Sequence, residues 1–151
     1  MIPRGHDAQI TKLVFEYSER IDTGDLAGVA DLLAEAGFGR GTGDLVYGRD
    51  RIQALFERTV HIYEDGTPRT KHLVTNLVVE VDEPAGTASA RSYWTVVQAL
   101  PDRGLGPILS GGYRDRFALR DGVWRFTERR IVTHLVGDTR HHLLPGAPGF
   151  E

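Results

Sequence analysis

The sequence predicts a single α+β domain in which three N-terminal helices pack on one face of a curved, mostly antiparallel sheet. Apolar residues recur with helical spacing through the first 64 residues, whereas from residue 69 they follow the period of two that is typical of strands. Helices followed by hairpin-linked strands are characteristic of the α+β class. The length of 151 residues fits one domain, which we place at residues 1–142, with 143–151, rich in Pro and Gly, as a loosely held tail.

Three helices are expected, over residues 7–22, 25–35 and 48–64. The first presents apolar side chains at i, i+3, i+4, i+7 and i+11 from Ile10, which is one face of a helix. Gly24 ends it, and Asp25 is a suitable N-cap for the second helix, which Gly37 ends. The turn sequence Asp65–Pro68 closes the third helix.

Four long strands are expected, over about residues 70–82, 87–99, 108–120 and 123–136. The pair Asp121-Gly122 is typical of a two-residue hairpin turn, so the last two strands are expected to be antiparallel neighbours. Residues 38–47 alternate in the same way but are rich in glycine, which predicts a loose edge strand. Residues 101–107, rich in Pro and Gly, predict a longer, mobile loop.

The strand over residues 70–82 has apolar side chains on both faces. Simple alternation puts Leu73, Leu77, Val79 and Val81 on one face and His72, Val74, Asn76 and Val78 on the other. A sheet that is apolar on both faces has to be covered on both. The helices cover one face and a second copy of the chain is the natural cover for the other, so we expect a homodimer.

Composition and charge exclude several classes of function. The formal net charge is -3 and there is no basic stripe, so no nucleic-acid partner is expected. No apolar run approaches the roughly 20 residues of a membrane helix, and the N-terminus lacks the apolar region of a signal peptide. We therefore expect a cytoplasmic protein without a membrane partner. The excess of Arg over Lys indicates a GC-rich, bacterial genome.

The usual motifs for cofactors and metals are missing from the sequence. The chain has no cysteine, Gly-rich phosphate loop, His-Glu-x-x-His pair or nucleophile elbow. The pair His141-His142 is only a weak metal signal, because it lies next to the expected tail. We therefore expect neither a metal nor a cofactor.

Three residues could carry acid–base chemistry. His72 lies among valines and is either a core histidine bonded to a carbonyl or carboxylate, or a general acid or base. Asp22 ends the first helix, where an anion gains nothing from the helix dipole; it is either solvated or, if it meets His72, orients that ring. Tyr17 lies on the apolar face of the same helix, either as a core aromatic or, in a pocket, as a hydrogen-bond donor to a substrate oxygen.

Five further residues are candidates for contact with a substrate: Asn76, Tyr93, Trp94, Tyr113 and Asp115. Asn76 is expected on the strand face of His72. Asp115 shares a face with Tyr113 and is either a carboxylate in the pocket wall or the ion-pair partner of an arginine on the next strand, Arg129 or Arg130. Tyr93 and Trp94 are adjacent, so one should line the pocket and the other the outer surface.

Three stretches of the chain resemble the SnoaL-like branch of the nuclear transport factor 2-like superfamily, over about residues 7–138. They are the helix end Tyr17–Asp25 (YSERIDTGD), the strand Thr70–Asn76 (TKHLVTN) and the hairpin Gly112–Phe126 (GYRDRFALRDGVWRF). The resemblance implies a cone-shaped α+β barrel, with the curved sheet wrapped around the helices and a pocket for a small hydrophobic ligand inside.

Within this superfamily the sequence is most similar to scytalone dehydratase and the bile acid 7α-dehydratases. Those enzymes pair an Asp at the end of the first helix with a His on the strand after the third helix, and Asp22 and His72 match these positions. The bile acid enzymes also have a Tyr five residues before the Asp, which Tyr17 matches. The sequence departs from scytalone dehydratase elsewhere, because its pocket Asn falls near Tyr113 and its second pocket His has no counterpart.

The resemblance implies a cofactor-independent lyase or isomerase, dehydratase-like, acting on a small ring-containing substrate such as a steroid, polyketide or terpenoid. In that case His72 transfers protons, Asp22 orients it and Tyr17 holds a carbonyl or leaving oxygen. Two alternatives stay open: a SnoaL-like cyclase or double-bond isomerase, and a non-catalytic ligand-binding or structural subunit of the same fold. An apolar cavity with the two side chains hydrogen-bonded inside favours an enzyme, whereas a filled cavity favours the structural role.

Overall fold

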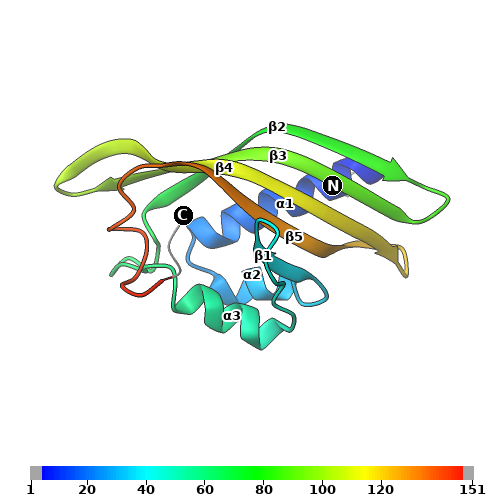
Figure 1. Cartoon of the computed structure of the whole chain (residues 1–151), viewed down its shortest axis with the longest axis horizontal. Coiled ribbons are helices and arrows are strands. Elements are labelled where there is room, and N and C mark those ends of the chain that lie inside the picture. The colour runs from blue at the N-terminus through cyan, green and yellow to red at the C-terminus, as the bar shows by residue number, and fades with distance from the viewer. Residues whose placement is uncertain (1–4, 148–151) are drawn as a thin grey trace.

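The computed structural model describes residues 5–147 and has the predicted α+β architecture (Figure 1). Its elements are α1 (His6–Asp22), α2 (Leu26–Leu32), β1 (Gly37–Arg40), α3 (Arg49–Glu57), β2 (Thr70–Asp82), β3 (Thr87–Leu100), β4 (Arg103–Arg120) and β5 (Val123–Val136). The strand order is β1-β5-β4-β3-β2, with β1 parallel to β5 and the other neighbours antiparallel. The prediction of helices packed on a curved, mostly antiparallel sheet is therefore confirmed.

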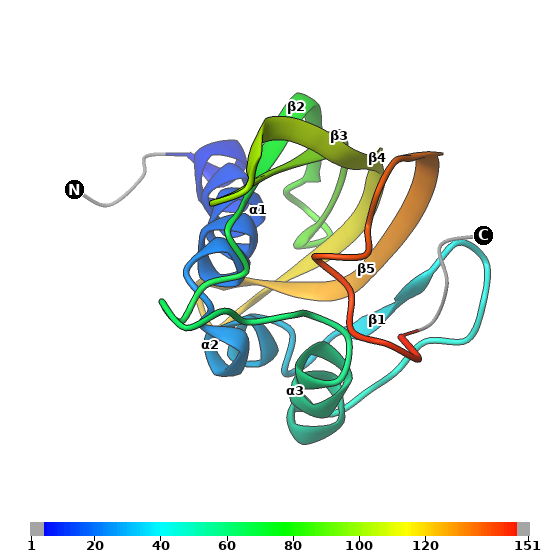
Figure 2. The ribbon, with the colours of Figure 1, turned by 90° about the vertical axis from the view of Figure 1, so that its left-hand side faces the viewer.

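The helices lie on the concave side of the sheet (Figure 2). α1 packs against β2 with the apolar face that the sequence predicts, and Ile10, Val14, Tyr17 and Ile21 are buried. β1 and β2 are the two edges of the sheet, so the cone is open rather than a closed barrel. The core therefore fills the space between α1 and the sheet, and the space toward α3 is left for the pocket.

Tight turns fix the end of α1, where Asp22 is the last residue. Gly24 has φ of 79°, and a side chain there would collide with the carbonyl oxygen of Gly66. Asp25 caps α2 as predicted, because its Oδ1 accepts a hydrogen bond of 2.8 Å from the Gly28 amide. These contacts hold the carboxylate of Asp22 at one place beside β2.

Three of the predicted boundaries were wrong. α3 ends at Glu57 rather than at residue 64, because Thr59 donates its hydroxyl to the Leu55 carbonyl and the chain leaves the helix for an isolated bridge to the C-terminal segment. The expected loop over 101–107 is mostly strand, since β4 begins at Arg103 and pairs with β3 up to the turn. The expected edge strand over 38–47 is shorter, β1 with a single antiparallel bridge back from Val46.

A β-bulge in β2 overturns the predicted faces of this strand. The register with β3 shifts between Thr75 and Val78, and Asn76 has φ of 53°. The bulge adds one residue to the strand. The inward face therefore begins with His72 and Val74 and continues with Leu77, Val79 and Val81. Leu73 and Val78 are instead exposed, by 47% and 37%. The outer face is therefore less apolar than alternation suggests, and the homodimer stays a prediction.

The segment after β5 returns to α3. Leu143 forms an antiparallel bridge with Val60, and the Leu144 amide donates a hydrogen bond of 2.9 Å to the Thr59 carbonyl. The first residues of the predicted tail are thus bonded to the domain, and residues 148–151 of that tail lie outside the described residues. Across residues 5–147, none of the helices has the length and apolar character to cross a membrane.

Candidate active site

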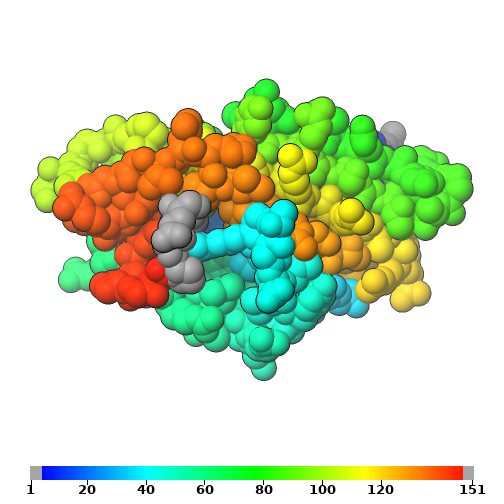
Figure 3. Space-filling view, viewed as in Figure 1, coloured from blue at the N-terminus to red at the C-terminus, as the bar shows by residue number. Residues whose placement is uncertain are grey.

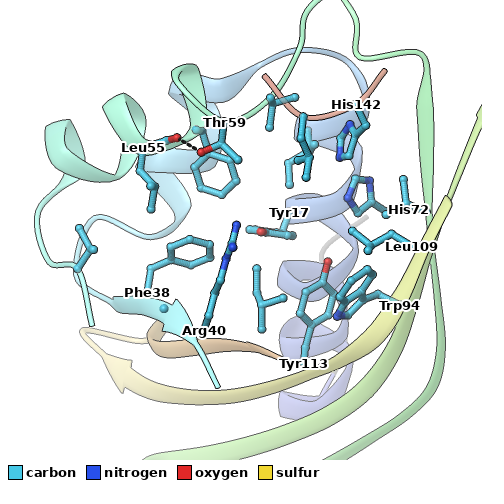
Figure 4. A pocket seen from close by; sticks show the side chains of 18 of the residues that line it. Tyr17, Phe38, Arg40, Leu55, Thr59, His72, Trp94, Leu109, Tyr113 and His142 are labelled. Atoms are coloured by element: carbon cyan, nitrogen blue, oxygen red, sulfur yellow. Dashed lines mark hydrogen bonds between the residues drawn. The ribbon is translucent and has the colours of Figure 1, made fainter. Parts of the chain in front are cut away.

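A largely apolar cavity of about 310 Å³ lies between α1, α3, β1 and the concave face of the sheet (Figure 4). Side chains from every layer of the fold line it, including Ile21, Phe38, Phe56, Val96 and Leu109. The polar side chains at its wall are few: two histidines, two tyrosines, a threonine, an arginine and one aspartate, Asp44. A cavity with apolar walls and a few convergent polar groups is the usual form of a small-molecule site.

His72 lines this cavity, and Asp22 lies behind it, bonded to its ring. Nδ1 of His72 lies 2.6 Å from Oδ1 of Asp22, and both side chains are more than nine-tenths buried. Asp22 also accepts the His72 backbone amide at 2.7 Å and the Thr70 hydroxyl at 2.9 Å. Thr70, two positions before His72 on β2, thus helps to hold the carboxylate. Asp22 is therefore not a solvated residue at the helix end, which was the alternative prediction for it.

The hydrogen bonds fix the charge of Asp22 and the tautomer of His72. Burial acts to raise the pKa of Asp22, but the bonds from the His72 ring, the His72 amide and the Thr70 hydroxyl outweigh it, so the pKa is lowered. Because a carboxylate only accepts, Nδ1 of neutral His72 carries the proton and donates it. The lone pair on Nε2 is then available to a ligand, which is the arrangement that a general base requires.

Tyr17 and Tyr113 project their phenol groups into the same cavity (Figure 4). Their rings pack edge to face, with the ring centres 5.7 Å apart. Burial raises the pKa of both, so both phenols stay protonated at neutral pH. Each phenol can therefore act as a hydrogen-bond donor.

A buried ion pair packs against the rings of Tyr17 and Tyr113. Asp115 pairs with Arg129, at 2.9 Å to Nε and 3.1 Å to Nη2, and both side chains are fully buried. The guanidinium carbon lies 4.1 Å from the ring centre of Tyr17 and 3.7 Å from that of Tyr113. Burial acts to lower the pKa of Arg129, but the Asp115 carboxylate outweighs it and the pKa is raised. Of the two roles predicted for Asp115, it is thus the ion-pair partner of Arg129 and not a carboxylate in the pocket wall.

The structure separates the remaining predicted contacts. Trp94 is 2% exposed and lines the cavity, whereas its neighbour Tyr93 is 53% exposed on the outer face. Asn76 lies on that outer face too, beside Tyr93 and His134, because the bulge in β2 turns it away from His72. The prediction that Asn76 shares the face of His72 is therefore wrong, and neither it nor Tyr93 reaches the pocket.

Several polar pocket residues escaped the sequence analysis, among them His142 and Arg40. His142 comes from the segment after β5 and its ring lies 6.3 Å from that of His72. Arg40 extends from β1 toward the cavity, and burial lowers its pKa (Figure 4). Only the His141-His142 pair gave a signal for the first of them, and nothing in the local pattern indicates that β1 forms a pocket wall. Within the part of the chain that the structure describes, no group of three carboxylate or histidine side chains could hold a metal ion.

Comparison with known proteins agrees with this geometry. The model of the SnoaL-like domain family matches residues 6–130. The chain belongs to the SnoaL-like family. A SnoaL-like assignment is also what the fold and the positions of Asp22 and His72 indicate. No curated protein matches the sequence.

Solved structures resemble this SnoaL-like chain over most of its length. Rv3472 from Mycobacterium tuberculosis, a protein of unknown function, is 30% identical, with a TM-score of 0.67 over 85% of this chain and 76% of that one. A protein from Novosphingobium aromaticivorans provisionally named a scytalone dehydratase is 25% identical, with a TM-score of 0.66 over 86% and 85%. A provisionally named aromatic ring hydroxylase from the same organism is 20% identical, with a TM-score of 0.69 over 93% and 99%, a likeness of fold alone.

Proposed function

We propose that this SnoaL-like protein is a cofactor-independent lyase that dehydrates a small, hydrophobic, ring-containing β-hydroxy ketone of the steroid, polyketide or terpenoid kind. One observation carries the proposal: His72 is held by Asp22 at 2.6 Å in the wall of an apolar cavity of about 310 Å³. The provisional name of the relative that is 25% identical, a scytalone dehydratase, supports the same reaction class.

The first step is removal of a proton from the carbon next to the carbonyl. Nε2 of His72 takes this proton, and the electron pair of the C–H bond moves toward the carbonyl to give an enolate. Asp22, held ionised by its three hydrogen bonds, stabilises the imidazolium that forms. Tyr17 donates its phenol hydrogen to the carbonyl oxygen, where negative charge develops.

The second step is departure of the β-hydroxyl group. The enolate electrons form the new carbon–carbon double bond as the C–O bond breaks, and the leaving oxygen takes the proton from Nε2 of His72. Water and an enone are the products, and His72 returns to its neutral state. One histidine therefore serves as base and then as acid, and the reaction consumes no other reagent.

The alternatives share part of this chemistry. A double-bond isomerase or an aldol-type cyclase uses the same proton removal, but its enolate is reprotonated at another carbon or attacks a second carbonyl. A structural subunit needs no cavity, and the open volume beside His72 argues against that role. A non-catalytic ligand carrier keeps the cavity but has no use for an ionised carboxylate that fixes the tautomer of one histidine.

A substrate panel tests the proposal. Wild-type protein is incubated with 2-decalone in deuterated water, where NMR follows α-proton exchange, and with 4-hydroxy-2-decalone, where ultraviolet absorbance follows the enone. We expect His72→Ala to lower both rates by about 10²–10⁴, the usual contribution of general acid–base catalysis. His134→Ala, on the outer face, is the matched control and should keep them. Wild-type protein that binds these ketones without exchange or elimination would refute the lyase and favour the carrier.

A further inference from the structure

The segment after β5 brings a second histidine to the pocket. The carbonyl of His142 accepts a hydrogen bond of 2.8 Å from the His61 amide. The carbonyl of His141 accepts two more, from the Tyr63 hydroxyl at 2.5 Å and from Nε2 of Gln98 at 3.1 Å. In the space-filling view this red-orange segment lies against the green residues at the end of α3 (Figure 3). The backbone of residues 141–142 is thus anchored to the segment after α3 and to β3, which fixes where the imidazole of His142 points.

That imidazole is buried but lacks a partner. His142 is 5% exposed, and its Nδ1 has no hydrogen-bond partner among residues 5–147. Burial, together with the neighbouring His72, lowers the pKa of His142 to about 4. The ring is therefore neutral at pH 7, with one nitrogen that donates and one that accepts. A buried polar atom without a partner costs folding free energy, so a ligand group that meets it binds with a corresponding gain.

The two histidines are arranged for one ligand oxygen. Their ring centres lie 6.3 Å apart at 66°, and both rings face the same cavity (Figure 4). Nδ1 of His72 is occupied by Asp22, so only its Nε2 is turned to a ligand. Two hydrogen bonds of about 2.8 Å to one oxygen join nitrogens at most about 5.6 Å apart, so one oxygen meets both rings through the nitrogens on their facing sides. Since the Asp22 carboxylate fixes Nδ1 of His72 while Nδ1 of His142 has no partner among the described residues, the two rings have different roles.

We propose that His142 contacts the substrate and selects a hydroxyl group. His142 accepts a hydrogen bond from the hydroxyl hydrogen, while Nε2 of His72 donates a proton to the oxygen of the same group. The proposal rests on the function proposed above, where that oxygen is the one that leaves. The hydroxyl keeps its own hydrogen, bonded to His142, and receives the second from Nε2 of His72 as the C–O bond breaks. His142 exchanges no proton in this step. Its hydrogen bond turns a lone pair of the oxygen toward His72, and a methyl ether at the same position cannot make it.

Equilibrium binding tests this inference without turnover. Isothermal titration compares three bicyclic alcohols, 2-decalol, 2-tetralol and borneol, with their methyl ethers. Wild-type protein should bind at least one alcohol about 10-fold more tightly than its ether, the value of one hydrogen bond to a buried group. His142→Phe keeps an aromatic ring and should remove this preference. His141→Phe is the matched control, because only its backbone carbonyl is used, and it should retain the preference.

A second measurement in the wild-type protein guards against a variant that fails to fold. In ¹⁵N spectra of the histidine rings, the alcohol should shift the nitrogens of His142 and the ether should leave them in place. Equal affinity for alcohols and ethers, binding of neither class up to 1 mM, or an unshifted His142 ring would overturn the inference. Loss of deuterium exchange with an intact alcohol preference would instead refute the lyase and leave the hydroxyl contact standing.

Discussion

Replacing Asp22 by Asn tests the tautomer argument, because the substitution keeps the shape of the side chain and removes its charge. Oδ2 of Asp22 accepts the His72 backbone amide at 2.7 Å, and Oδ1 accepts both the Thr70 hydroxyl at 2.9 Å and Nδ1 of His72 at 2.6 Å. The backbone amide can only donate, so the Asn oxygen has to face it. The Asn amide nitrogen then faces the other two groups.

This orientation forces a change in His72. The amide nitrogen of Asn is a donor, so Nδ1 of His72 has to accept and the ring proton moves to Nε2. The Thr70 hydroxyl rotates to accept as well. Nε2 then has no lone pair for proton removal, and activity should fall by about 10²–10⁴. Each of the three bonds to the Asp22 carboxylate contributes about 1–1.5 kcal/mol more than a neutral bond would. More than half of the combined difference should remain after the Asn side chain forms its own bonds, so we expect a loss of about 2 kcal/mol in stability. For this chain length that is roughly 4–8 °C in Tm.

Long-range ¹H–¹⁵N NMR of the histidine rings is the assay, since protonated and unprotonated ring nitrogens differ widely in shift. At a pH where His72 is neutral, wild-type protein should show the Nδ1–H tautomer and Asp22→Asn the Nε2–H tautomer. Asp31→Asn, at an exposed carboxylate paired with Arg49, is the control and should leave His72 unchanged. A His72 ring that keeps the Nδ1–H tautomer in Asp22→Asn would refute the reasoning.

Two further predictions concern stability. Arg129→Met leaves Asp115 buried without its partner and should cost about 3–5 kcal/mol in thermal unfolding, whereas Arg129→Met combined with Asp115→Leu should recover most of it; a double variant as unstable as the single one contradicts this. The pKa of Asp22 is lower in the folded protein than its unfolded value of 3.8. Its contribution to stability is therefore complete above pH 3.8 and is lost as the pH falls from 3.8 through the folded pKa. In urea titrations from about pH 5 to 2.5, below the range in which free histidines titrate, the stability difference between wild type and Asp22→Asn should therefore be constant at first and then shrink; a difference that grows over this range contradicts it.

The buried pair of Asp115 and Arg129 also links the fold to the pocket. The guanidinium lies against the rings of Tyr17 and Tyr113 on the side away from the cavity, within 4.1 Å of both ring centres. Two phenols from different elements, α1 and β4, are therefore placed by one cation on β5. We therefore expect loss of that cation to change the position of both hydroxyls as well as to lower stability.

The sequence by itself determined the order and type of the elements, because hydrophobic period is a local property of the chain. It also placed Asp22 at the end of α1 and His72 early in β2, and the two meet once α1 packs on the edge strand. The pairing of Asp115 with an arginine on the next strand was within reach for the same reason, since hairpin register brings strand neighbours together.

Only the tertiary structure decided which side chains enter the pocket. A bulge depends on how two strands match in register, so alternation put Asn76 on the wrong face of β2. The end of α3 depends on contacts with Leu143, more than 80 residues away in the chain, and helical periodicity does not record such a contact. His142 reaches His72 because its backbone bonds to the segment after α3 and to β3. The local spacing of apolar residues determines which element a residue belongs to, whereas long-range backbone hydrogen bonds determine whether its side chain reaches the pocket.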